Sequence, residues 1–184
     1  MCIRDSADHN TIAGALVAQR LDSQRVIVGE EIMTTRGEIL AAYVTEEIPP
    51  GLSPQETIKR LRDQGAFISV SHPFDFGRSG AWKLEDLLEI APLVDAIEIF
   101  NARSLTPGCN QRASEFARQY HLPGTAGSDA HTVFELGVAA LVLPQFAGPD
   151  ALRNVIREGK VQGRLSPFWV HFASRYAHLR KKVV

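Results

Sequence analysis

The sequence predicts a single α/β domain, and two observations carry this prediction. Short apolar runs alternate along the chain with segments of helical periodicity, which is the pattern of repeated strand–helix units. Side chains that commonly bind metal ions follow several of the apolar runs, at the point where each strand would end. A length of 184 residues suits one domain with a real core, and no repeat or linker divides it.

The expected elements follow from local signals. The helices are expected over 11–21, from Pro54 to near Gly65, and over 84–90, 110–121 and 150–158. The strands are expected over 25–32, 38–45, 66–71, 95–100 and 138–143, with a short one starting at Thr125. The Gly37 turn joins the first two strands and favours a hairpin.

Two helix starts are marked in the sequence. Ser53 precedes Pro54 and stands three residues before Glu56, which predicts a capped helix with proline at its first position. Asn10 is the expected N-cap of the helix over 11–21. That helix would carry three apolar side chains on one face: Ile12, Leu16 and Val17.

Composition limits the classes of function. The formal net charge of −1 gives no global field that would attract nucleic acid or an anionic membrane. Cys2 and Cys109 are too few for a disulfide scaffold, so we expect a cytoplasmic protein. No apolar run reaches the roughly 18 residues of a membrane span.

The candidate metal ligands lie at strand ends. They are Asp8 and His9 before the first helix, then Glu31, His72, Asp129 and His131. Because the carboxyl ends of parallel strands converge on one rim, these side chains can meet there. Any one of them alone has an ordinary structural explanation, and only their coincidence favours a site. Imidazole and carboxylate ligands together suit zinc, manganese or iron.

Two further residues are candidates for binding substrate. Asn101 follows the strand over 95–100, where it either ends the strand or faces the site. Arg103 could bind a substrate phosphate, and a structural role is about equally expected. The segment 166–184 is rich in basic and aromatic residues and is expected to form a C-terminal helix docked on the domain.

Five segments together resemble the PHP (polymerase and histidinol phosphatase) family: Asp8–Thr11, Gly29–Ile32, Ser71–Pro73, Glu98–Asn101 and Gly127–His131. The resemblance implies a distorted (β/α)7 barrel with two or three divalent ions, Mn, Zn or Fe, at its carboxyl rim. It also implies hydrolysis of phosphomonoesters, or of nucleotide and oligonucleotide phosphodiesters, by a metal-activated water. The partner is then a small phosphorylated substrate, a nucleotide or a short oligonucleotide, and no membrane.

The resemblance assigns roles to individual residues. The implied metal ligands are His9, Glu31, His72, Asp129 and His131, with Glu31 as the bridging carboxylate. Asp129 is also a candidate catalytic carboxylate. Asp8 or a water molecule would protonate the leaving oxygen.

The sequence departs from the family pattern at two places. The family opens with a strand that carries a His-x-His motif, and no such motif precedes Asp8. Many members also place a histidine in the second hairpin strand, where we align Leu40, so a leaner site is expected. We therefore interpret residues 1–6, which show no strand pattern, as a foreign start. Residues 7–165 would form a barrel domain that lacks its first strand or strands, with low stability and little or no activity.

Two other classes of function stay open. Histidine-rich barrels also include metal-dependent amidohydrolases, although no candidate bridging lysine lies beside the predicted rim. A non-catalytic domain with a relic metal site, which would bind nucleic acid through the basic tail, is the second alternative. The oligomeric state is left open by the sequence.

Overall fold

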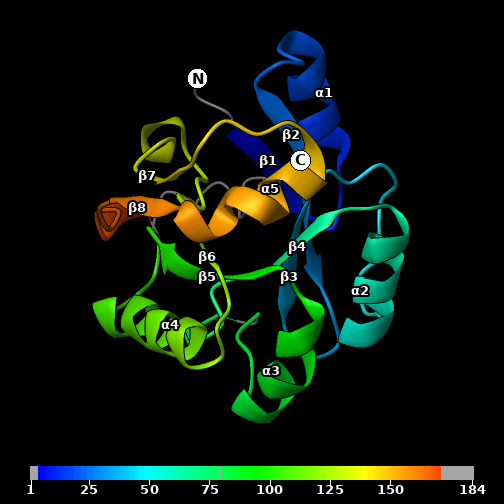
Figure 1. The fold of residues 1–184 in the computed structure, drawn as a ribbon. Helices are drawn as coiled ribbons and strands as arrows, with labels where there is room; N and C mark the ends of the chain where they lie inside the picture. The colour runs from blue at the N-terminus through cyan, green and yellow to red at the C-terminus, as the bar shows by residue number, and fades with distance from the viewer. Residues whose placement is uncertain (1–3, 79, 171–184) are drawn as a thin grey trace, which may run out of the picture.

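A computed structural model describes residues 4–78 and 80–170, which fold around a curled six-stranded sheet (Figure 1). The strands follow one another across the sheet in chain order: β1 (Arg4–His9), β2 (Val26–Met33), β3 (Glu38–Ala42), β4 (Phe67–Val70), β5 (Ala96–Asn101) and β6 (Gly124–Gly127). β1 and β2 are parallel, β2–β3–β4 are antiparallel, and β4–β5–β6 are parallel. The predicted α/β class and the hairpin are confirmed.

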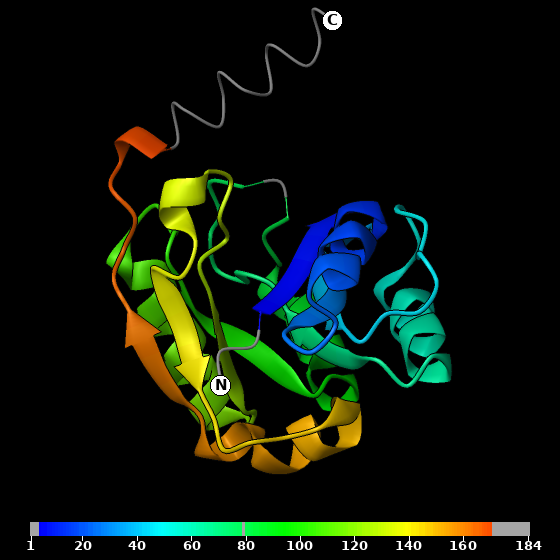
Figure 2. The ribbon, with the colours of Figure 1, turned by 90° about the horizontal axis from the view of Figure 1, so that it is seen from above.

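Helices connect the strands. They are α1 (Ala13–Leu21), α2 (Pro54–Asp63), α3 (Leu84–Ile90), α4 (Pro107–Gln119) and α5 (Gly148–Val155), with short 3-10 turns η1 (Ala91–Leu93), η2 (Val133–Glu135) and η3 (Ile156–Glu158). A separate two-stranded antiparallel ladder joins β7 (Ala139–Val142) to β8 (Lys160–Gly163), seen in yellow and orange in Figure 2.

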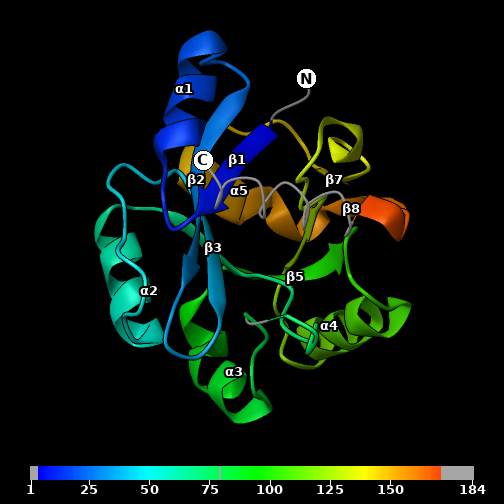
Figure 3. The same cartoon turned by 180° about the vertical axis from the view of Figure 1, so that it is seen from behind.

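The two faces of the six-stranded sheet differ in polarity. Ile39 pairs with Val70 and Ala41 with Ile68, so these four side chains share one face, and all are buried. That face packs against the apolar sides of α2, α3 and α4, which lie around the outside of the strands in Figures 1 and 3. We call it the outer face, and it holds the main hydrophobic core.

The opposite face, which we call the inner face, carries an apolar cluster at the amino ends of β4 and β5. Phe67 and Ala96, the first residues of β4 and β5, pack there against Leu152 of α5 and Ile156 of η3. α5 crosses the sheet in front in Figure 1 and behind in Figure 3. Because α5 covers the amino ends of β4 and β5, their carboxyl ends are left for polar side chains.

Several local predictions are confirmed. The helix over 84–90 is α3 with the same bounds. Ser53 caps α2, since its Oγ accepts a hydrogen bond from the Glu56 backbone N–H at 3.2 Å. Gly65 follows the end of α2 with a φ of 75°, the left-handed conformation that glycine adopts without strain.

The start of the chain differs from the prediction. Arg4–Ser6, expected to be outside any strand, belongs to β1 and pairs in parallel with Val26–Val28. A polar composition hides this strand, because an edge strand needs only backbone pairing on one side. The predicted seven-strand barrel count and the absent first strand stay predictions.

The first helix also differs. The predicted N-cap is wrong, because Asn10 Oδ1 accepts a hydrogen bond from the Met33 backbone N–H at 2.8 Å instead of capping α1. The helix buries Ala15, whereas Leu16 and Val17 are exposed. α1 lies against β1 and β2 at the edge of the sheet, where less of its surface is covered.

The last part of the chain holds one element that the sequence did not reveal. β8 is exposed at every position, so it lacks the apolar pattern from which strands are predicted. The predicted C-terminal helix over 166–184 lies for the most part outside the described residues.

Glu30 gives a prediction for stability. This side chain is fully buried on β2, and burial raises its pKa to about 7 from a usual 4.5. Because the folded state favours protonated Glu30, the free energy of unfolding should fall as pH rises from about 4.5 to about 7. Glu30→Gln removes the titrating group and should therefore flatten part of this fall. The amide oxygen of glutamine can still accept the hydrogen bond from the Ile48 N–H.

The measurement is urea unfolding at several pH values, with the exposed Glu46→Gln as the control. Glu46→Gln should follow the wild-type curve. Equal pH slopes for Glu30→Gln and the wild type would contradict the prediction.

Candidate metal centre

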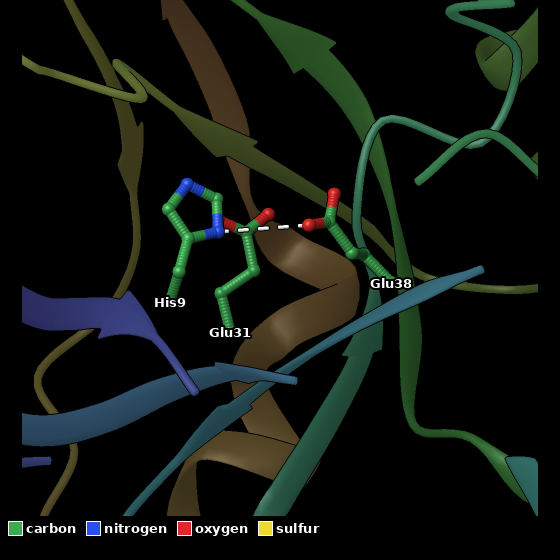
Figure 4. A group of neighbouring side chains, drawn as sticks. All are labelled: His9, Glu31 and Glu38. Atoms are coloured by element: carbon green, nitrogen blue, oxygen red, sulfur yellow. Dashed lines mark ion pairs between the residues drawn. The ribbon is translucent and has the colours of Figure 1, made fainter. Parts of the chain in front are cut away.

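His9, Glu31 and Glu38 converge at one end of the inner face (Figure 4). His9 ends β1 and lies in register with Glu31 of β2, so both side chains leave the sheet on the same side. Glu38 stands two residues before Leu40, the cross-strand partner of Glu31, and therefore points the same way. His9 Nδ1 lies 3.2 Å from Glu31 Oε2 and 3.5 Å from Glu38 Oε1.

His72 brings a second imidazole to the same two carboxylates. It follows β4, and its Nε2 lies 3.1 Å from Glu31 Oε1 and 3.1 Å from Glu38 Oε2. Ser71 donates a hydrogen bond from Oγ to Glu31 Oε1 at 2.6 Å. The side chain of His72 is 1% exposed and that of His9 is 51% exposed, so the cluster opens to solvent on the His9 side.

The close contacts shift the pKa values of these groups. The hydrogen bond to Glu38 raises the pKa of His9 to about 9. Burial alone would lower the pKa of His72, but hydrogen bonds to Glu31 and Glu38 raise it to about 10. Burial would raise the pKa of Glu38, but hydrogen bonds from His72 and His9 lower it to about 2. The Glu38 carboxylate is therefore ionised and is balanced by the protonated imidazoles of His9 and His72.

A second group of polar side chains lies next to this cluster. Asn101 at the end of β5 donates from Nδ2 to Glu98 Oε2 at 3.1 Å and to Asp129 Oδ2 at 3.2 Å. Glu98 also accepts the backbone N–H of His72 at 2.8 Å, which ties the two groups together. His131 Nδ1 lies 3.4 Å from Asp129 Oδ1, and the rings of His131 and His9 are 5.9 Å apart.

In the second group, burial and neighbouring charges shift the pKa values of the two carboxyl groups in opposite directions. Glu98 is buried, and burial raises its pKa to about 7. Burial also disfavours charge on Asp129, but the Arg78 guanidinium beside it holds the pKa of Asp129 below its usual range. Arg78 Nη1 forms a direct ion pair with Asp129 Oδ2.

The backbone is strained at two of these residues. His72 has a φ of 22° and Asp129 a φ of 49°, both in the left-handed region that costs side-chain-bearing residues energy. Such strain persists where surrounding contacts fix the conformation, and it concentrates at functional sites. Both residues also follow strands of the sheet, where the polar cluster forms.

The first cluster fits a divalent metal ion. One ligand atom each from His9, Glu31 and Glu38 lies within 4.8 Å of the others. His72 contacts the same two carboxylates. Two imidazoles with two carboxylates form the mixed nitrogen and oxygen set that zinc, manganese and iron accept.

The structure brings most of the predicted site residues together. His9, Glu31 and His72 share the first cluster, and Asn101, Asp129 and His131 form the second group beside it. These positions agree with the predicted roles as ligands and substrate contacts, which stay predictions.

Two predicted site residues are not brought to the cluster. Asp8 precedes His9 in β1 and so points to the other side of the sheet, where its carboxylate is against Gly14 of α1. Arg103 is buried, and its Nε lies 3.4 Å from the buried Glu135 Oε1. Their positions give no support to proton donation by Asp8 or to phosphate binding by Arg103.

Three site residues were missed in the sequence. Glu38 lies on the inner face two residues before Leu40, and strand alternation from Glu31 across the hairpin could have found it. The leaner site expected from Leu40 stays a prediction. Alternation could not have found Glu98, because residues three apart on a regular strand face opposite sides; the register shift between Glu98 and Phe100 lets Glu98 contact Asn101. Nothing in the local sequence distinguishes Arg78, because a loop between β4 and α3 delivers it.

Comparisons with known proteins agree with this picture. Residues 107–161 match the family model described as PHP-associated. The chain is 40% identical over 116 residues to the uncharacterized protein MJ0417 of Methanocaldococcus jannaschii, covering 61% of the chain and 49% of that protein. It is 38% identical over 99 residues to MJ1587 of the same organism, covering 52% of the chain and 55% of that protein. The matches thus span about half the length of these relatives.

A solved structure shows the same fold. It is a two-domain protein of Bacteroides vulgatus that contains a predicted PHP-like metal-dependent phosphoesterase, with a TM-score of 0.68 at 14% identity. The match covers 89% of this chain and 56% of that one. The family-model match over residues 107–161 and the shared fold both support a relationship to the PHP family.

No helix within the described residues has the length and apolar character needed to cross a membrane.

Gly80 offers a test of the first cluster. A Cβ at this position would overlap the carboxylate of Glu38, so Gly80→Ala must displace that side chain. We expect weaker Mn²⁺ binding in equilibrium dialysis and a loss of about 1–3 kcal/mol in the free energy of unfolding.

Gly108→Ala is the matched control. A Cβ there meets only Thr106 Oγ1 at 3.8 Å, and alanine in a helix should stabilise α4 by about 0.5–1 kcal/mol. Undiminished Mn²⁺ affinity in Gly80→Ala would show that Glu38 does not take part in the site.

Proposed function

We propose that this chain forms the metal-binding part of a metal-dependent phosphoesterase. The observation that carries the proposal is the contact of His9 and His72 with the same two carboxylates, Glu31 and Glu38, at the carboxyl end of a PHP-type sheet. The phosphoesterase named in the Bacteroides vulgatus protein, which shares this fold, supports the choice of reaction.

Two sets of residues would hold metal ions. His9, Glu31, Glu38 and His72 form the first set, in which Glu31 reaches both imidazoles and is placed to bridge. Asp129 and His131 form the second, beside the exposed imidazole of His9. Two or three ions of manganese, zinc or iron would suit these donors. When bound, such ions neutralise charge on a phosphoryl oxygen and make water more acidic.

The other side chains keep these ligands in place. Ser71 holds Glu31 through its Oγ, and Glu98 holds the backbone of His72. Asn101 bonds to Glu98 and Asp129 at once, so it fixes the distance between the two groups. Such support limits ligand motion, and its loss typically costs about 10- to 100-fold in metal affinity.

The substrate would be a small phosphorylated molecule, a nucleotide or a short oligonucleotide. His9 is half exposed and marks the side from which a phosphate enters. With a net charge of −1, the protein as a whole does not attract long nucleic acids, so recognition would depend on groups close to the metal ions.

Metal content and turnover test the proposal together. Purified without chelator, the wild-type chain should contain at least one Mn, Zn or Fe per molecule by elemental analysis. Glu31→Gln and Asp129→Asn remove charge without changing shape, and each should lower metal affinity by about tenfold or more. Hydrolysis of 4-nitrophenyl phosphate or bis(4-nitrophenyl) phosphate should fall in parallel.

His121→Asn is the control, because His121 follows α4, away from the cluster, with a φ of 55° that asparagine tolerates. This variant should keep wild-type metal content and turnover. Absence of metal from the wild-type chain, even after incubation with Mn²⁺, would overturn the proposal and favour a non-catalytic binding domain.

A further inference from the structure

We propose that Arg78 binds the substrate phosphate, an inference that rests on the phosphoesterase function proposed above. Arg78 lies in the segment between β4 and α3, and its side chain is 21% exposed. Its guanidinium contacts three acceptors, which come from its own segment, from the segment after β5 and from the segment after β6.

Two of these contacts fix the orientation of the guanidinium. Nε lies 3.3 Å from Asp75 Oδ2, and Nη2 donates to the Arg103 backbone carbonyl at 3.2 Å. Asp75 is buried, and its backbone carbonyl accepts the Arg78 N–H at 2.9 Å. A guanidinium fixed along two edges has little freedom to swing away from the site.

The third contact points into the site. Nη1 pairs with Asp129 Oδ2, and the same carboxylate is close to Asn101 and His131. Asp129 is a proposed metal ligand, and a carboxylate whose charge is shared with a metal ion is a weaker acceptor for Nη1. A phosphate oxygen can then take its place, because a planar guanidinium matches the geometry of phosphate.

Arg78 adds a cation to a site rich in carboxylates. Glu31, Glu38, Glu98 and Asp129 all lie within the two groups, and a guanidinium next to them would favour the approach of an anionic substrate. Arg103, the arginine expected from the sequence to bind phosphate, is instead buried beside Glu135. Arg78 is partly exposed and already faces a proposed ligand, so it is better placed to receive the phosphate.

The test is calorimetric titration of the Mn²⁺-loaded chain with inorganic phosphate, comparing the wild type with Arg78→Met and Arg78→Lys. One lost charge-assisted hydrogen bond should weaken phosphate binding about 10- to 100-fold in Arg78→Met. Arg78→Lys should recover part of the affinity, because it restores the charge without the planar geometry. KM for 4-nitrophenyl phosphate should rise more than kcat falls.

Arg36→Met is the matched control. Arg36 pairs with Asp86 and Glu89 at 2.7 and 2.8 Å on the surface, so this variant loses an ion-paired arginine outside the site. It should keep wild-type phosphate affinity. Thermal unfolding and elemental analysis of each variant establish that it is folded and carries the wild-type amount of metal.

The outcomes separate this inference from the proposed function. Unchanged phosphate affinity in Arg78→Met would overturn the role of Arg78, even with phosphoesterase activity intact. Loss of metal in Arg78→Met and Arg78→Lys would also overturn it, because Arg78 would then only position Asp129. If no phosphoester is hydrolysed by any form, the proposed function fails, whereas weaker phosphate binding in Arg78→Met would still support an oxyanion site at Arg78.

Discussion

Repulsion among carboxylates is the constraint on which this site depends. Glu31, Glu38, Glu98 and Asp129 lie close together and largely out of water, where like charges interact strongly. Each has a partner that offsets its charge or its lost hydration, such as His72 for Glu31 and Glu38. The arrangement holds only while these partners are present, so metal ions, protonated histidines and Arg78 are alternative ways to balance the same negative charge.

The sheet makes this concentration of charge possible. Its outer face is apolar and carries the main core, so most of the apolar packing does not involve the polar end of the inner face. α5 fills the amino-terminal end of the inner face against Phe67 and Ala96. Only the opposite end remains polar, and neighbouring strands bring one or two polar side chains each to that end.

Comparison of the sequence with the structure shows which site residues can be predicted. His9, Glu31 and His72 were predicted to meet, and the structure brings them together: His9 ends β1, Glu31 lies within β2 and His72 follows β4. Glu38 was not among the predicted ligands, although strand alternation places it on the same face as Leu40, the cross-strand partner of Glu31. Asp8 was also predicted to take part in the site. It is adjacent to His9 in β1, and neighbouring side chains of a strand point to opposite faces of the sheet.

The α/β class, the hairpin, most helix bounds and the histidine and carboxylate residue types of the candidate site could be predicted from the sequence. These depend on periodicity, turns and caps, which are local properties of the chain. Local signals could not predict that Arg78 pairs with Asp129 or that Arg103 is buried against Glu135. The physical reason is that such pairs join segments 51 and 32 residues apart, and their meeting depends on how the whole sheet curls.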